Sequence, residues 1–88
     1  MNQKTLFQSE DLSFIATVIL LDKGISIERI TFHPLKPNVK VFHLSPTDIV
    51  QHLYRQYVSD QLQVSPQRLS TKIAAIRHLP AETEGNYD

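Results

Sequence analysis

Apolar residues near the start of the chain recur with the spacing of a helix. They are Leu12, Ile15, Ala16, Ile19 and Leu20. This i, i+3, i+4, i+7, i+8 order places them along one face and predicts an amphipathic helix over residues 10–23. Ser9 is positioned to cap the first turn, where the acids Glu10 and Asp11 complement the helix dipole. Gly24 follows the last turn and can take the left-handed conformation that ends a helix.

The period then changes, because residues 25–33 are rich in β-branched and aromatic side chains and predict a strand. The alternation of apolar positions slips by one at Glu28-Arg29, which indicates a β-bulge or a strand that is apolar on both faces. Residues 34–38 contain two prolines and an asparagine and predict a turn, and residues 39–44 predict a second strand. The short connection favours an antiparallel hairpin, which helices must cover on at least one face because two strands alone are marginally stable.

Two more helices are predicted in the second half of the chain. Ser45 as the cap and Pro46 at the first helical position begin the earlier one. Its apolar positions are Ile49, Val50, Leu53, Tyr54, Tyr57, Val58 and Leu62. Ser65 and Pro66 begin the later helix in the same way, and Pro80 stops it. Its apolar face consists of Leu69, Ile73 and Ile76. The order is therefore α-β-β-α-α, and we expect an α+β domain in which an antiparallel hairpin packs against three helices.

A length of 88 residues is enough for one domain and too short for two. We expect residues 1–80 to form a single small globular domain. Residues 81–88 contain acids and no Lys or Arg, and we expect them to be a disordered acidic tail. No apolar run approaches the roughly 20 residues that a bilayer requires, and none follows Lys4 as in a secretory signal. These patterns predict a cytoplasmic protein without membrane contact. The small size also favours association with itself or with a partner, because such a domain has little stability margin.

The charged residues balance, with nine Lys and Arg against nine Asp and Glu. A net charge of zero removes the chain-wide case for a nucleic-acid coat or a polybasic membrane binder. Hydrophobic residues make up 41% of the chain and charged residues 20%, as in folded proteins rather than disordered ones. The absence of cysteine excludes a disulfide framework, a thiolate zinc site and a thiol nucleophile.

Several short motifs are spread over residues 7–79. They are an F-x-[ST]-x-D-L opening at residues 7–12, the helix that ends at Gly24, the pair Val41-Phe42, Tyr57, and the step at residues 64–66. In these the chain resembles a family of small bacterial and phage proteins that is known only as a domain of unknown function. The turn at residues 34–38 is longer than expected of that family. The resemblance implies a bacterial or mobile-element setting and assigns no catalytic residue.

Residues that carry chemistry are scattered along the chain. None of the four histidines has a second histidine or an acid at a recognisable metal-ligand spacing, and only His33 and His43 are placed to face each other across the hairpin. The chain has two glycines, no phosphate-binding loop and no G-x-S-x-G elbow, and its acids stand where capping or solvated acids belong. We therefore expect a non-enzymatic protein with no catalytic residue, metal, cofactor or small-molecule substrate.

Residues 58–73 have the pattern of a DNA-binding helix-turn-helix. In that interpretation Val64, Leu69 and Ile73 form the buried angle, while Gln63 occupies the turn position that usually requires glycine. The side chains projected toward bases and phosphates are Arg55, Gln67, Arg68, Ser70, Thr71 and Lys72. Four cations against two acids over residues 47–79 give a weak electrostatic attraction for DNA, and an ordinary pair of amphipathic helices shows the same pattern.

The competing hypothesis is a protein-interaction module. The second strand carries apolar side chains on both faces, with Val41 on one and Phe42 on the other, so an uncovered face or edge is available for another chain unless the hairpin is fully enclosed. Tyr54 and Tyr57 add the amphipathic rings that interfaces favour. The predicted interaction residues are therefore Val41, Phe42, Tyr54 and Tyr57. We expect a binding domain that acts through a protein partner or self-association, with a helix-turn-helix-like DNA-binding accessory or regulatory protein as the alternative.

Overall fold

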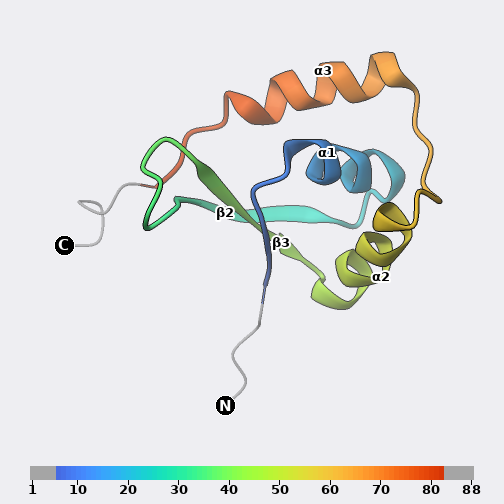
Figure 1. Ribbon diagram of the computed structural model, residues 1–88, viewed down its shortest axis with the longest axis horizontal. Coiled ribbons are helices and arrows are strands. Elements are labelled where there is room, and N and C mark those ends of the chain that lie inside the picture. The colour runs from blue at the N-terminus through green and yellow to red at the C-terminus, as the bar shows by residue number, and fades with distance from the viewer. Residues whose placement is uncertain (1–5, 83–88) are drawn as a thin grey trace.

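The structure, a computed structural model, describes residues 6–82. Its elements, in chain order, are β1 (Phe7–Ser9), α1 (Leu12–Leu21), β2 (Ser26–Phe32), β3 (Lys40–Ser45), α2 (Thr47–Val58) and α3 (Pro66–Arg77) (Figure 1). The three strands form one antiparallel sheet in the order β1-β3-β2. The α+β class is confirmed, whereas the predicted α-β-β-α-α order lacks the first strand.

Strand β1 is the element that sequence patterning missed. It is three residues long and pairs with β3, with Phe7 opposite Leu44 and Ser9 opposite Phe42. Three residues are too few to display a period of two, and the pairing joins segments more than 30 residues apart in the chain. Nothing local to residues 7–9 therefore distinguishes a strand from the approach to a helix.

The hairpin of β2 and β3 and its bulge are present as predicted. Ile27 pairs with Leu44 and Arg29 with His43, so Glu28 is the extra residue at the slip in the apolar pattern. The turn over residues 34–38 is closed by the Val39 N–H, which donates to the carbonyl of residue 36 at 2.9 Å. The bulge returns Ile30 to the same face as Ile27, and this face is the apolar one.

Helix α1 begins later than predicted, at Leu12, and its cap is Asp11 rather than Ser9. The Asp11 carboxylate accepts from the N–H of Phe14 at 3.2 Å. Ser9 is the last residue of β1, and its hydroxyl accepts from the N–H of Asp11 at 3.1 Å. The predicted Ser9 cap is therefore wrong, because pairing with β3 holds that residue in the sheet.

The end of α1 also differs from the prediction. The helix stops at Leu21, and Gly24 does not adopt a left-handed conformation. The extended residue Asp22 ends the helix instead, with its N–H donating to the Val18 carbonyl at 2.9 Å. Its side-chain carboxylate then accepts from the N–H of Gly24 at 2.8 Å, which turns the chain toward β2 without a positive φ angle.

Both ends of α2 differ from the prediction. Ser45 belongs to β3 and its hydroxyl donates to the carboxylate of Glu28, so the predicted Ser45 cap is wrong and Pro46 occupies the cap position. At the other end Asp60 is left-handed, with φ of 60°. The N–H groups of Asp60 and Gln61 donate to the Tyr57 and Gln56 carbonyls, an arrangement that ends helices in a tight turn.

Helix α3 begins as predicted, because the Ser65 side chain accepts from the N–H of Arg68 and Pro66 stands in the first turn. Its C-terminus is held by a contact that the sequence does not reveal. The Lys40 ammonium, from the start of β3, donates to the carbonyls of Arg77 and Leu79 at 2.8 and 2.6 Å. A cation at this position satisfies free carbonyls and complements the helix dipole.

One hydrophobic core joins these elements, and the helices lie on a single face of the sheet. The buried apolar residues are Phe14, Ile15, Ala16, Val18, Ile25, Ile30, Phe42, Leu44, Val50 and Ile76. Helix α1 contributes four of them, more than any other element, and packs against α3 along one side (Figure 1). Rings from β1 and α2 close the other side, where Tyr57 and Tyr54 contact Phe14 at centroid distances of 5.1 and 5.2 Å.

Candidate functional site

The four predicted interaction residues do not form one surface. Phe42 is 1% exposed and belongs to the core, so its assignment as a contact residue is wrong. Tyr57 is half-buried against the Phe14 ring, and Tyr54 is 42% exposed while contacting the rings of Phe7 and Phe14. Val41 lies on the opposite face of β3 from Phe42 and is half-buried. The residues therefore divide between the core, α2 and the sheet face that no helix covers among residues 6–82.

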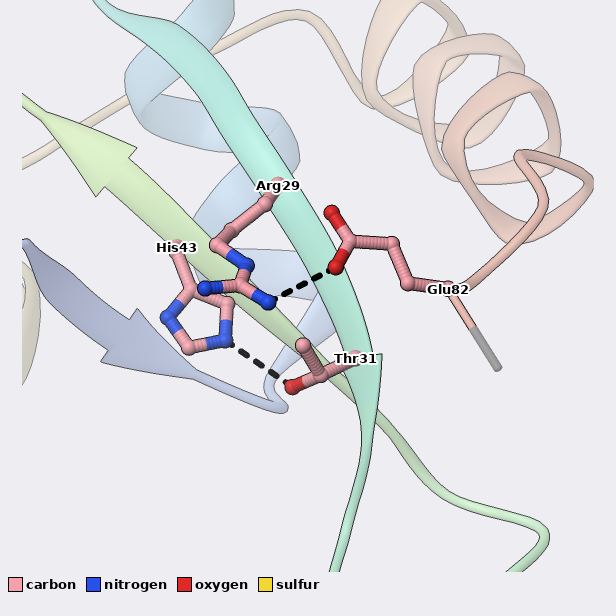
Figure 2. A network of polar contacts seen from close by, with 4 residues as sticks. All are labelled: Arg29, Thr31, His43 and Glu82. Carbon is pink, nitrogen blue, oxygen red and sulfur yellow. Dashed lines mark hydrogen bonds and ion pairs between the residues drawn. The ribbon is translucent and has the colours of Figure 1, made fainter. Parts of the chain in front are cut away.

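That open face of the sheet carries a network of polar side chains. Figure 2 shows Arg29 and Thr31 of β2, His43 of β3 and Glu82 on one side of the strands, with α1 passing behind them. The Thr31 hydroxyl and His43 Nε2 lie 2.9 Å apart, and the Arg29 guanidinium forms an ion pair of 2.7 Å with the Glu82 carboxylate. Because these polar side chains bond to one another, this face of the sheet is stable without a helix packed over it.

The surroundings of His43 favour the neutral form of its ring. Burial lowers the pKa of His43 from its ordinary value, the nearby Arg29 charge lowers it further, and Glu82 opposes both effects. His33 lies four pairs farther along the hairpin than His43, so the two histidines do not face each other as predicted. The Nε2 atom of His33 lies 3.6 Å from the Glu10 carboxylate. Within the part of the chain that the structure describes, no group of three His, Asp or Glu side chains is placed to hold a metal ion.

The residues projected toward DNA are placed on two elements. Helix α2 ends at Val58 and residues 59–65 form no helix, so the first helix of the predicted helix-turn-helix is absent from that segment. Helix α3 packs along α1 instead. Gln67, Arg68, Thr71 and Lys72 line a hollow between α3 and Leu20, whereas Ser70 lines another side of α3 and Arg55 is on α2.

Among residues 6–82, the outer edge of β2 pairs with another segment only near its C-terminal end. Strand β3 pairs with one side of β2, and on its other side Glu82 forms a parallel bridge with Thr31. The N–H of Glu82 donates to the Ile30 carbonyl at 2.7 Å, and Ala81 packs against the core. Ala81 and Glu82 thus differ from the predicted disordered tail, whose remaining residues, 83–88, lie outside the described residues.

Beside this edge runs a groove between α3, α1 and the start of β2, which we name the α3 groove. It consists of two adjoining hollows of about 340 and 370 Å³ that share Lys72 and Ala75. Its apolar lining is Ile19, Leu20, Ile25, Ile27, Ala75, Ile76 and Leu79. Arg68 and Lys72, one turn apart on α3, are its two cations. Sequence reasoning missed the groove because residues from three elements form it, and it assigned Arg68 and Lys72 to DNA.

No protein-family model, curated protein or solved structure matches this chain. None of the helices in residues 6–82 combines the length and the apolar character needed to cross a membrane. The resemblance to small bacterial and phage proteins therefore stays a prediction, and the proposals below depend on the geometry of the chain alone.

Proposed function

We propose that this protein acts by binding rather than by catalysis, as a module that accepts an extended segment of a partner protein along the outer edge of β2 and in the α3 groove. The observation that carries the proposal is the contact made by Glu82. This residue pairs through its main chain with the β2 edge while the neighbouring Ala81 packs against the core. The chain itself thus supplies an example of extended backbone on this edge.

Strand addition is a common mode of peptide recognition. The main chain of the peptide bonds to a sheet edge, and alternate side chains enter pockets beside it. Strand β2 is seven residues long, and the bridge to Glu82 lies near its end, at Thr31. The apolar side chains of Ile25 and Ile27, at the other end of this strand, line the α3 groove. Edge and groove together therefore provide the two components of this mode.

A partner of different sequence fits this site better than a second copy of the chain. A two-fold contact brings the same surface of both molecules together, so that surface must be complementary to itself. The groove lining contains Arg68 and Lys72 and no carboxylate. A symmetric contact there places like charges opposite each other, which is unfavourable.

A selection experiment tests the proposal. A random peptide library displayed on phage is selected against the full chain, and a recovered peptide is titrated into isotopically labelled protein. We expect the largest amide shift changes along β2 and on the groove side of α3. Changes confined to α2 or to the open sheet face, or a selection that recovers no binder, contradict the proposal.

A matched pair of alanine variants makes the mapping specific. Ala74 and Ala75 are both exposed, but Ala75 lines the groove whereas Ala74 lines a different hollow on another side of α3. Ala75→Gln adds bulk without charge inside the groove and should weaken peptide binding by about tenfold or more. Ala74→Gln carries the same cost in helix propensity and should leave binding unchanged. Equal effects of the two substitutions place the peptide outside the groove.

A further inference from the structure

We infer that the partner segment bound by the α3 groove is acidic as well as apolar, with a carboxylate that meets Arg68 and Lys72. This inference rests on the proposed function, since it names the chemistry of the partner at the same site. Three observations support it. The two cations have no ion-pair partner among the described residues, the groove around them is apolar, and the chain's own Glu82 pairs with the same strand edge and with a cation.

Within residues 6–82 the two cations have no acidic partner. Arg29 forms an ion pair with Glu82, and His33 lies near the Glu10 carboxylate, whereas neither Arg68 nor Lys72 has an ion pair among the described residues. Arg68 and Lys72 stand four residues apart on α3. Like charges at this spacing repel across one helical turn and reduce helix stability slightly. Their placement therefore favours an anion from outside the chain over a role in the fold.

The lining around these cations strengthens their attraction for a carboxylate. Both line the same hollow as the apolar side chains of Leu20 and Ala75. Lys72 is half-buried, and it also lines the hollow that contains Ile25 and Ile27. A partner that fills the apolar part excludes water, and attraction between opposite charges is larger where water is excluded. An apolar segment with a nearby acid therefore gains binding free energy from both the apolar lining and the two cations of the groove.

The segment that includes Ala81 and Glu82 illustrates the chemistry that this edge accepts. Ala81 packs its small apolar side chain against the core. Glu82 bonds to the Ile30 carbonyl through its main chain and places its carboxylate 2.7 Å from the Arg29 guanidinium. A partner segment that continues this pattern toward the start of β2 presents apolar residues to the groove and acids to Arg68 and Lys72.

Duplex DNA is the other anionic partner that these cations suggest. DNA affinity depends on neutralising several phosphates, and the groove offers two cations within an apolar lining. The residues that would complete a DNA surface are separated, because Arg55 is on α2 and Ser70 lines a different hollow from Arg68. The lining therefore favours an acidic peptide over DNA.

Two displayed libraries test the inference, one with all residue types and one without Asp and Glu. We expect edge-binding peptides from the complete library and none of comparable affinity from the acid-free library. Binders from the acid-free library that map to β2 and depend on Ala75 overturn the inference and leave the proposed function intact. Peptides that map elsewhere overturn the proposed function itself.

Variants that remove the charges of the groove provide a second test of the inference. The double variant Arg68→Met and Lys72→Met keeps long side chains but removes both charges. It should weaken the binding of an acidic peptide by about tenfold or more, and the loss of affinity should be smaller at high salt. Arg55→Met, which removes an exposed cation from α2, should leave binding unchanged. Matching circular dichroism spectra establish that each variant is folded. Equal binding by the double variant, or tighter binding of a random DNA duplex than of the peptide at low salt, overturns the inference.

Discussion

The two faces of the sheet are built from the same strands and have opposite characters. On the covered face Ile30, Phe42 and Leu44 are 7%, 1% and 0% exposed, and they pack against helix α1. On the open face Thr31 and His43 are half-exposed and bond to each other. The covered face stabilises the fold by burying apolar area, whereas the open face satisfies its polar groups locally. Our proposal therefore places the partner at neither face but at the outer edge of β2 and in the α3 groove.

The largest expected difference between the faces comes from two adjacent residues of β3. Phe42→Ala removes a buried ring and leaves a cavity, so we expect a loss of about 3–5 kcal/mol in the free energy of unfolding. Val41→Ala, on the open face, should cost about 1 kcal/mol or less because that side chain is half-exposed. Denaturant titration of both variants measures the contrast. Similar losses for the two variants mean that the faces are assigned incorrectly.

A smaller effect is expected at the charged end of the covered face. Lys40→Met removes the ammonium that binds the Arg77 and Leu79 carbonyls, while keeping a side chain of similar length. We expect a loss of about 1 kcal/mol, typical of a helix-end contact, and faster amide exchange in the last turn of α3. Unchanged exchange there would falsify the role of Lys40 as a C-terminal cap.

The open face should respond to acid through His43. Its pKa is lowered by burial first and by Arg29 second, so the unfolded chain takes up this proton at a higher pH than the folded chain. Above about pH 6.5 both states are neutral at this site and the contribution vanishes. Stability should fall as the pH drops below about 6.5 and level off below the folded pKa. His43→Gln should lose this part of the pH dependence, and an NMR titration that gives His43 a raised pKa contradicts the assignment.

The smallest effect is expected for the ion pair on the open face. Both side chains are about 40% exposed, so Arg29→Gln should cost about 0.5 kcal/mol or less, and the difference from the parent should shrink in high salt. Thermal unfolding at low and high salt measures it. A loss of several kcal/mol that persists in salt shows that Arg29 belongs to the stabilising core rather than to a surface network.

The sequence predicted those parts of the fold that depend on neighbouring residues. Helical spacing located all three helices, and the slip at Glu28 located the bulge, because each signal lies within a few residues of its element. Strand β1 and the pairing of Glu82 escaped prediction because distant segments form them. The helix end at Asp60 escaped because a left-handed aspartate carries a weaker sequence signal than glycine. That last error extended α2 and produced the helix-turn-helix interpretation.

The candidate site was less predictable than the fold. The sequence indicated that a strand edge or face was available to a partner, but periodicity alone did not distinguish buried Phe42 from half-exposed Val41 as the contact residue. It also singled out Arg68 and Lys72 as cations that face a ligand. Their position beside Leu20 rather than beside a second DNA-binding helix depends on how α3 packs on α1.

Amide hydrogen exchange along β2 tests most directly whether its outer edge receives a partner strand. Exchange is compared for the free full chain and for the chain saturated with a selected acidic peptide. Strand pairing should slow exchange within β2 (Ser26–Phe32), with much smaller changes in β1 (Phe7–Ser9) at the other edge of the sheet. Unchanged exchange in β2 in the presence of bound peptide contradicts docking by strand addition.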